Sequence, residues 1–105
     1  MEFINLTPHA LVVAGRTIEP SGQVARVSVE YVDAGRIGGI PVVIQQFGEV
    51  EGLPDPQEGV VFIVSGMVLS AVRNRQDVFA PDTGPTATRN EKGHIVGVAR
   101  LIEAP

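Results

Sequence analysis

The chain has 105 residues, a formal net charge of −4 and no cysteine. This length suits one domain, residues 1–105, and leaves no room for a second hydrophobic core. An acidic chain disfavours binding to nucleic acids or anionic membranes, and a chain without cysteine has no disulfide, thiolate nucleophile or Cys-type zinc site.

The composition favours strands over helices. There are 17 Val and 8 Ile residues, and such β-branched side chains suit a pleated, half-buried backbone. We expect a mainly β protein: a single compact antiparallel open barrel or β-roll with one short helix, with a two-layer α+β arrangement as the alternative. The N-terminus does not resemble a signal peptide and no stretch reaches 18 apolar residues, so we expect a cytoplasmic protein.

The first third of the chain predicts short strands and one longer strand. Phe3–Leu6 is a short apolar start. The apolar run Ala10–Ala14 is followed by Gly15-Arg16, which suits a tight hairpin turn, and Thr17–Glu19 is the predicted return strand. Gln23–Val32 has the clearest strand pattern, because apolar and polar residues alternate along it.

The middle of the chain predicts two further strands separated by loops. Asp33–Gly39 contains three glycines and is a predicted loop, and Pro41–Phe47 is a predicted strand with proline at its start. Glu49–Gly59 is acidic and has two prolines, which favours a solvated loop. Val60–Val64 follows as a short apolar run, typical of a buried strand.

One helix is predicted, from Gly66 to Asn74. Ser65 is its expected N-cap. The side chains expected on its apolar face are Met67, Val68, Ala71 and Val72.

The last third predicts a loop and a hairpin. Gln76–Thr86 is a predicted ordered loop because of its prolines and glycine. Thr86–Arg89 and Ile95–Ile102 are the predicted arms of a hairpin, which closes through a turn at Asn90–Gly93.

Basic, acidic and hydroxyl side chains are concentrated between residues 73 and 89. Arginine binds phosphates and carboxylates through its planar guanidinium, and a rigid Gly-containing loop exposes backbone N–H groups that bind anions. We therefore predict an anion-binding site here, and the alternative is that the aspartates pair with the arginines and only fix the loop. The predicted ligand-binding residues are Arg73, Arg75, Asp77, Asp82, Thr83, Gly84, Thr86 and Arg89, with Thr7 and His9 as a second tier.

Other chemistry is not favoured by any motif. His9 and His94 are the only imidazoles and lack metal-ligand spacing, so we predict no metal site and no cofactor. Ser65 follows a strand, but position 63 is Ile where a nucleophile elbow has Gly, so helix capping explains it better. An enzyme would use Asp77 or Asp82 as general acid or base with one histidine assisting; without a catalytic signature, we expect a non-enzymatic protein.

Several segments, in this order, resemble a group of small uncharacterised proteins from bacteria and their phages. The resemblance covers nearly the whole chain; it implies a prokaryotic or phage origin, and no activity comes with it. The segments are Ile4–His9, Pro20–Arg26, Gly52–Pro54, Ile63–Ser65, Arg75–Asp77 and Ala80–Pro85.

Two hypotheses of function follow. The first is a small-molecule binding protein, possibly one of a phage type that sequesters an anionic, nucleotide-like signal, an analogy at the level of protein class only. The second is a protein-interaction module, an inhibitor or assembly factor that acts through a strand edge or the acidic loop 49–58. An exposed strand edge would also pair two copies of the chain, so we expect a homo-oligomer.

Overall fold

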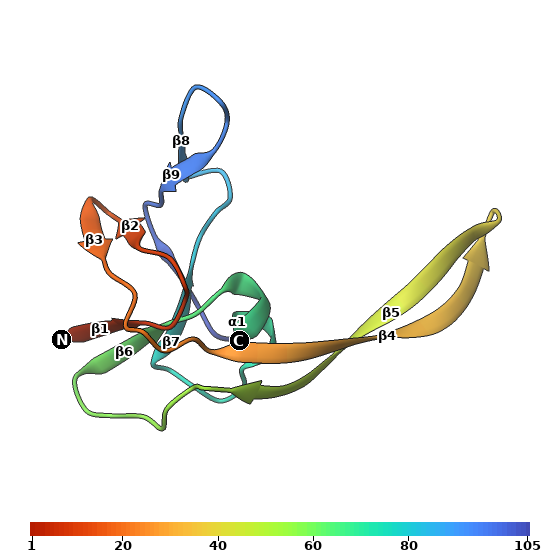
Figure 1. Ribbon diagram of the computed structural model, residues 1–105, viewed down its shortest axis with the longest axis horizontal. Helices are drawn as coiled ribbons and strands as arrows, with labels where there is room; N and C mark the ends of the chain where they lie inside the picture. Colours follow the sequence, from red (N-terminus) through yellow and green to blue (C-terminus); the bar gives the residue numbers. More distant parts are fainter.

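A computed structural model describes residues 1–105, and a four-stranded sheet forms the body of the molecule (Figure 1). The strand order is β1-β6-β7-β10. β1 pairs with β6 and β6 with β7 in parallel, whereas β7 and β10 are antiparallel. The four strands are β1 (Glu2–Asn5), β6 (Val60–Ile63), β7 (Val78–Pro81) and β10 (Leu101–Glu103).

Three separate two-stranded sheets and one helix complete the fold. All three are antiparallel hairpins. Their strands are β2 (Leu11–Val13) with β3 (Arg16–Ile18), β4 (Arg26–Ile37) with β5 (Ile40–Glu51), and β8 (Thr88–Arg89) with β9 (Ile95–Gly97). The helix is α1 (Gly66–Ala71), and no helix is long and apolar enough to cross a bilayer.

The expected mainly β composition with one short helix is confirmed, but the expected antiparallel barrel or roll is not. The sheets are open and the central one is mixed. The reason is the crossover through α1, because a strand that returns after a helix lies parallel to its predecessor. The chain is also extended: its radius of gyration is 16.0 Å, whereas a compact chain of this length has about 13 Å.

The helix is capped as predicted and ends earlier than predicted. The Ser65 Oγ accepts a hydrogen bond from the Val68 N–H at 3.3 Å. Val72 already has an extended backbone, so the helix stops at Ala71 and does not reach Asn74. Leu69 is buried, whereas Met67, expected on the apolar face, is half exposed.

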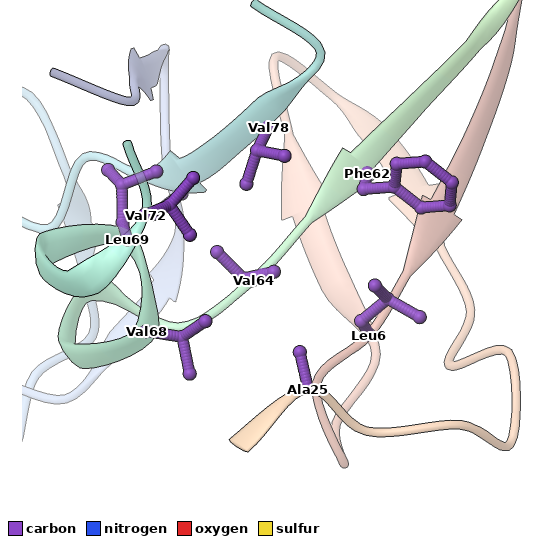
Figure 2. Close-up of a cluster of buried hydrophobic side chains, with 9 residues drawn as sticks. Leu6, Ala25, Phe62, Val64, Val68, Leu69, Val72 and Val78 are labelled. Carbon is purple, nitrogen blue, oxygen red and sulfur yellow. The ribbon is translucent and has the colours of Figure 1, made fainter. Parts of the chain in front are cut away.

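The main core lies between α1 and one face of the central sheet. Phe62 and Val64 of the β6 segment alternate towards this face and are fully buried, as is Val78 of β7. Figure 2 shows Val64 and Val78 beside the side chains of the helix, and Phe62 on the other side of the cluster with Leu6. The cluster consists of Leu6, Ala25, Phe62, Val64, Val68, Leu69, Val72, Val78 and Ala80.

β4 and β5 form one long hairpin, which we call the arm (residues 26–51). It projects from the body, and most of its length lies far from the other elements (Figure 1). The predicted loop Asp33–Gly39 is therefore wrong over most of its length. The strand continues past Val32 with an irregularity after Asp33, and only Gly38 and Gly39 form the turn. Both have positive φ, 56° and 81°, as a two-residue type I′ turn requires.

Three other expectations need correction. β7 is a strand of the central sheet inside the predicted loop Gln76–Thr86; Val78 and Ala80 are buried in it. The predicted final strand Ile95–Ile102 is two strands, since β9 pairs with β8 whereas β10 pairs with β7. The predicted turn at Gly15-Arg16 is displaced by one residue to Ala14-Gly15, and both of these residues have positive φ.

Candidate functional site

The predicted anion-binding residues include two that bind each other. The Arg75 Nε and one Nη each donate to a different carboxylate oxygen of Asp77, at 2.8 and 2.9 Å. The same Nη donates to the Pro54 carbonyl at 2.9 Å. These hydrogen bonds from Arg75 hold the pKa of Asp77 below its ordinary value, with burial opposing. Most of the Arg75 guanidinium therefore binds groups of the chain itself. It connects the acidic loop, through Pro54, to Asp77 at the start of β7.

Asp82 has a similar structural role at the other end of β7. Its Oδ2 accepts a hydrogen bond from the Arg100 Nε, and its Oδ1 accepts one from the Gly84 N–H at 2.9 Å. These bonds, with the Arg100 bond contributing most, lower the pKa of Asp82. Thr83 and Thr86 are exposed. The alternative interpretation of the aspartates, loop fixation, agrees with this geometry; the partner of Asp82 is an arginine outside the predicted cluster.

The predicted ligand-binding residues between positions 73 and 89 lie in separate parts of the fold. Asp77 and Asp82 flank a four-residue strand, which separates them by roughly 16 Å. Arg73 is at the end of α1, where it donates to the carbonyls of Ser70 and Val72. Arg89 lies in the β8–β9 hairpin, which stands apart from α1 (Figure 1). One small anion cannot contact all of these groups, so the ligand hypothesis stays a prediction without a common site.

Two surface hollows contain predicted arginines. One, of about 760 Å³, is lined by Arg75 and also by the carboxylates of Asp77 and Glu103. These acids disfavour an anionic ligand there. The other, of about 620 Å³, combines Arg89 and Lys92 with Glu91 on the turn of the β8–β9 hairpin. Each hollow thus places an acidic group beside the arginine.

The second-tier residues belong to a structural network centred on Asn5. The Asn5 side chain is buried; its Nδ2 donates to the carbonyls of His9 and Ile18, and its Oδ1 accepts from the Thr7 N–H at 2.9 Å. The Thr7 hydroxyl lies 2.6 Å from the same Oδ1. Thr7 is therefore engaged within the chain, and His9 contributes a carbonyl oxygen rather than its imidazole to this network.

The residues proposed for catalysis do not form a constellation. No hydrogen bond or ion pair joins the side chain of His9 or His94 to Asp77 or Asp82. The lowered pKa of each aspartate keeps its carboxylate ionised at neutral pH, which does not suit a general acid. No group of three or more His, Asp or Glu residues is placed to hold a metal ion.

The most distinctive surface of the molecule is the arm. Twenty of its 24 strand residues are exposed, which is unusual because an isolated two-stranded hairpin is only marginally stable in water. Only its root contacts the core, through Val27 and Val50. The exposed large apolar residues beyond the root are Tyr31, Val32, Ile37, Ile40, Val43, Ile44 and Phe47.

The outer edges of the arm also carry unpaired backbone groups. A two-residue turn closes on a hydrogen-bonded pair, here Ile37 and Ile40. Alternation along β5 then directs the N–H and C=O groups of Val43, Gln45 and Phe47 away from β4. No backbone hydrogen bond joins this part of the arm to any other element, so the edge is free to pair with another strand.

Neither a protein-family model, nor a curated protein, nor a solved structure matches the chain.

The arm was accessible to sequence reasoning but was missed. Both of its strands were predicted, as Gln23–Val32 and Pro41–Phe47. The missed signal is Gly38-Gly39 between two isoleucines, since a two-residue Gly-Gly connection between apolar runs is typical of a hairpin. Three glycines within five residues favoured a loop instead.

Proposed function

We propose that the protein is a non-enzymatic protein-interaction module that acts through the arm. The observation that supports this proposal is a projecting two-stranded hairpin with seven large apolar residues exposed beyond its root. These residues lie on both faces of the hairpin, because neighbours along a strand point to opposite sides, and such a concentration of exposed apolar side chains is typical of protein-binding surfaces. An unpaired strand edge adds the backbone hydrogen bonds of strand addition, in which one chain extends the sheet of another.

This proposal places the function on a strand edge, as in the second of the hypotheses from the sequence. The acidic loop 49–58 has a supporting position, because its first residues belong to β5 and Pro54 is tied to Arg75. The loop thereby helps to hold the root of the arm against the body.

Photo-crosslinking in cells tests the proposal. A benzophenone amino acid at Tyr31, which is 65% exposed on the arm, is expected to give one defined protein adduct. The matched control carries the same group at Val96, an exposed apolar residue of β9. An arm position that gives no protein adduct, or no more than Val96 gives, contradicts the proposed function.

A further inference from the structure

From the proposed function, on which this inference rests, we infer that the partner of the arm is a second copy of the same chain. The two arms lie antiparallel about a two-fold axis, with their β5 edges paired and the tip of each arm at the root of the other. The result is a four-stranded antiparallel sheet, β4-β5-β5-β4. Charge on the two edges, charge at the two ends and backbone geometry support this arrangement.

The two edges of the arm differ in charge. β4 contains Arg26, Glu30, Asp33 and Arg36, whereas β5 has no charged side chain between Ile40 and Gly48. Charged side chains on an edge strand block the addition of further strands. Pairing through β5 therefore leaves the two charged β4 strands as the outer edges, which stops the assembly at two chains.

The middle of β5 suits a two-fold axis. The residue that lies on such an axis faces its own copy. A charged side chain at this position would therefore be repelled by the same side chain of the second copy. With the axis at Ile44, an apolar residue that is 55% exposed in the single chain, the two copies of Ile44 face each other. This register places Val43 opposite Gln45 of the second copy, so that the outward N–H and C=O groups of both residues become paired.

The same register brings opposite charges together at both ends. It places the turn residue Gly39 near Gly48 and Glu49 of the second copy, where β5 has a register irregularity. The Arg36 guanidinium lies at Gly39, since its Nη1 donates to the Gly39 carbonyl at 3.0 Å. Neither Arg36 nor Glu49 has an ion-pair partner within the chain. The two-fold axis generates this contact twice, so the dimer contains two pairs of Arg36 with Glu49 of the other copy.

Pairing also accounts for an extended hairpin that has no support from the body beyond its root. Three or more strands are needed for an independently stable sheet, and the second copy supplies two. Pro41 limits the pairing at each end: it lies opposite Phe47 of the second copy and offers no N–H to it, so Val43 and Gln45 form the complete hydrogen-bonded pairs.

Charge reversal tests both the identity of the partner and the tip-to-root geometry. Sedimentation equilibrium of the purified full chain is expected to show a monomer–dimer equilibrium. Arg36→Glu and Glu49→Arg are each expected to raise the dissociation constant more than about tenfold, because each replaces attraction by repulsion twice. An equimolar mixture of the two variants is expected to restore the dimer, since each arginine then meets a glutamate.

The controls carry the same charge changes elsewhere. Arg89→Glu is matched to Arg36→Glu, because each arginine donates to a glycine carbonyl in its own hairpin, and Glu91→Arg is matched to Glu49→Arg. Both controls are expected to dimerise like the wild type. Ile44→Lys places two like charges on the axis and leaves Arg36 and Glu49 unchanged. This variant is expected to dissociate the dimer.

Three results would overturn the inference: a wild-type chain that is monomeric at all concentrations, assemblies larger than two chains, or a mixture of variants that stays monomeric. If the wild type is monomeric while Tyr31 still crosslinks to a different protein, the inference fails and the proposed function stands. If Tyr31 crosslinks to no protein, the proposed function fails as well.

Discussion

Asn5 is the most heavily used polar side chain in the body. It is 1% exposed, and its amide satisfies groups of three other residues, Thr7, His9 and Ile18. Its backbone carbonyl also accepts hydrogen bonds from Ser21. A buried polar group without a partner costs about 1–3 kcal/mol. One side chain therefore holds together β1, the 7–9 turn and the end of β3.

Replacing Asn5 by alanine removes these bonds. We expect Asn5→Ala to lower the free energy of unfolding by about 3 kcal/mol, because several backbone groups lose their partner. Urea denaturation measures the change. Asn90→Ala is the control, because Asn90 also accepts two backbone hydrogen bonds but is exposed, and a loss below about 1 kcal/mol is expected for it. Equal losses for both variants would contradict a special role of Asn5.

The Arg75–Asp77 pair makes the stability depend on pH. The pKa of Asp77 is lower in the folded chain than in the unfolded chain, because Arg75 donates to its carboxylate. The unfolded chain therefore binds the proton more readily. The stabilisation is complete above the unfolded pKa of about 4 and is lost as the pH falls through the folded value.

Asp77→Asn tests this dependence. At pH 7 we expect it to lower the free energy of unfolding by about 1–2 kcal/mol, because the charged hydrogen bonds are weakened. The difference from the wild type is expected to shrink as the pH is lowered from about 5 to 2.5. Denaturant titrations at several pH values give the comparison, with Glu58→Gln as an exposed control. A difference that does not change with pH would show that the pair contributes no charge-dependent stability.

At the scale of elements, the arm and the body have different sources of stability. The body strands and α1 share one apolar cluster, whereas beyond its root the arm has only the hydrogen bonds between its own strands. Val27 and Val50 fix the root because they pack against the cluster. The remainder of the arm adds exposed surface and adds nothing to the core.

Shortening the arm separates these contributions. Replacing residues 31–45 by Asn-Gly keeps Glu30 and Gln46 as the closing pair of a two-residue turn. We expect the shortened chain to fold, with a free energy of unfolding within about 1 kcal/mol of the monomeric Arg36→Glu variant. Denaturation at equal chain concentration is the measurement. A shortened chain that does not fold would show that the arm stabilises the body.

At the scale of the whole molecule, shape is the most informative property. The chain measures 50 × 39 × 23 Å, and the arm accounts for the longest dimension (Figure 1). A surface this extended is costly for a monomer, because apolar side chains of the arm stay in water. Association of two arms would remove part of this cost.

Hydrogen exchange is expected to differ across the molecule. In the monomeric Arg36→Glu variant, amides of Val43 and Gln45 should exchange rapidly, because their N–H groups face solvent. In the concentrated wild type they should exchange slowly, while the buried amides of Phe62 and Val64 should be protected in both. Mass spectrometry of arm peptides gives the comparison, and arm amides that exchange at the same rate in both proteins would contradict pairing through β5.

Local patterns were sufficient to predict the short-range features of this protein. The alternation of Val27 and Val29, the cap at Ser65 and the turn at Asn90–Gly93 depend on neighbours within a few residues, and the structure has all three. Tyr31, which continues the alternation, is exposed. The mainly β composition follows from the abundance of β-branched residues in the same way.

Long-range pairing was decided only by the tertiary structure. Val78–Pro81 looks like a loop because of its flanking residues, and it becomes a strand because β6 and β10 offer hydrogen bonds on both sides. The partner of Asp82 is Arg100, 18 residues away and outside the predicted cluster, which no local pattern indicates. Residue types and short-range geometry are properties of a segment, whereas hydrogen-bond partners, burial and the exposure of the arm depend on which distant segments the fold brings together.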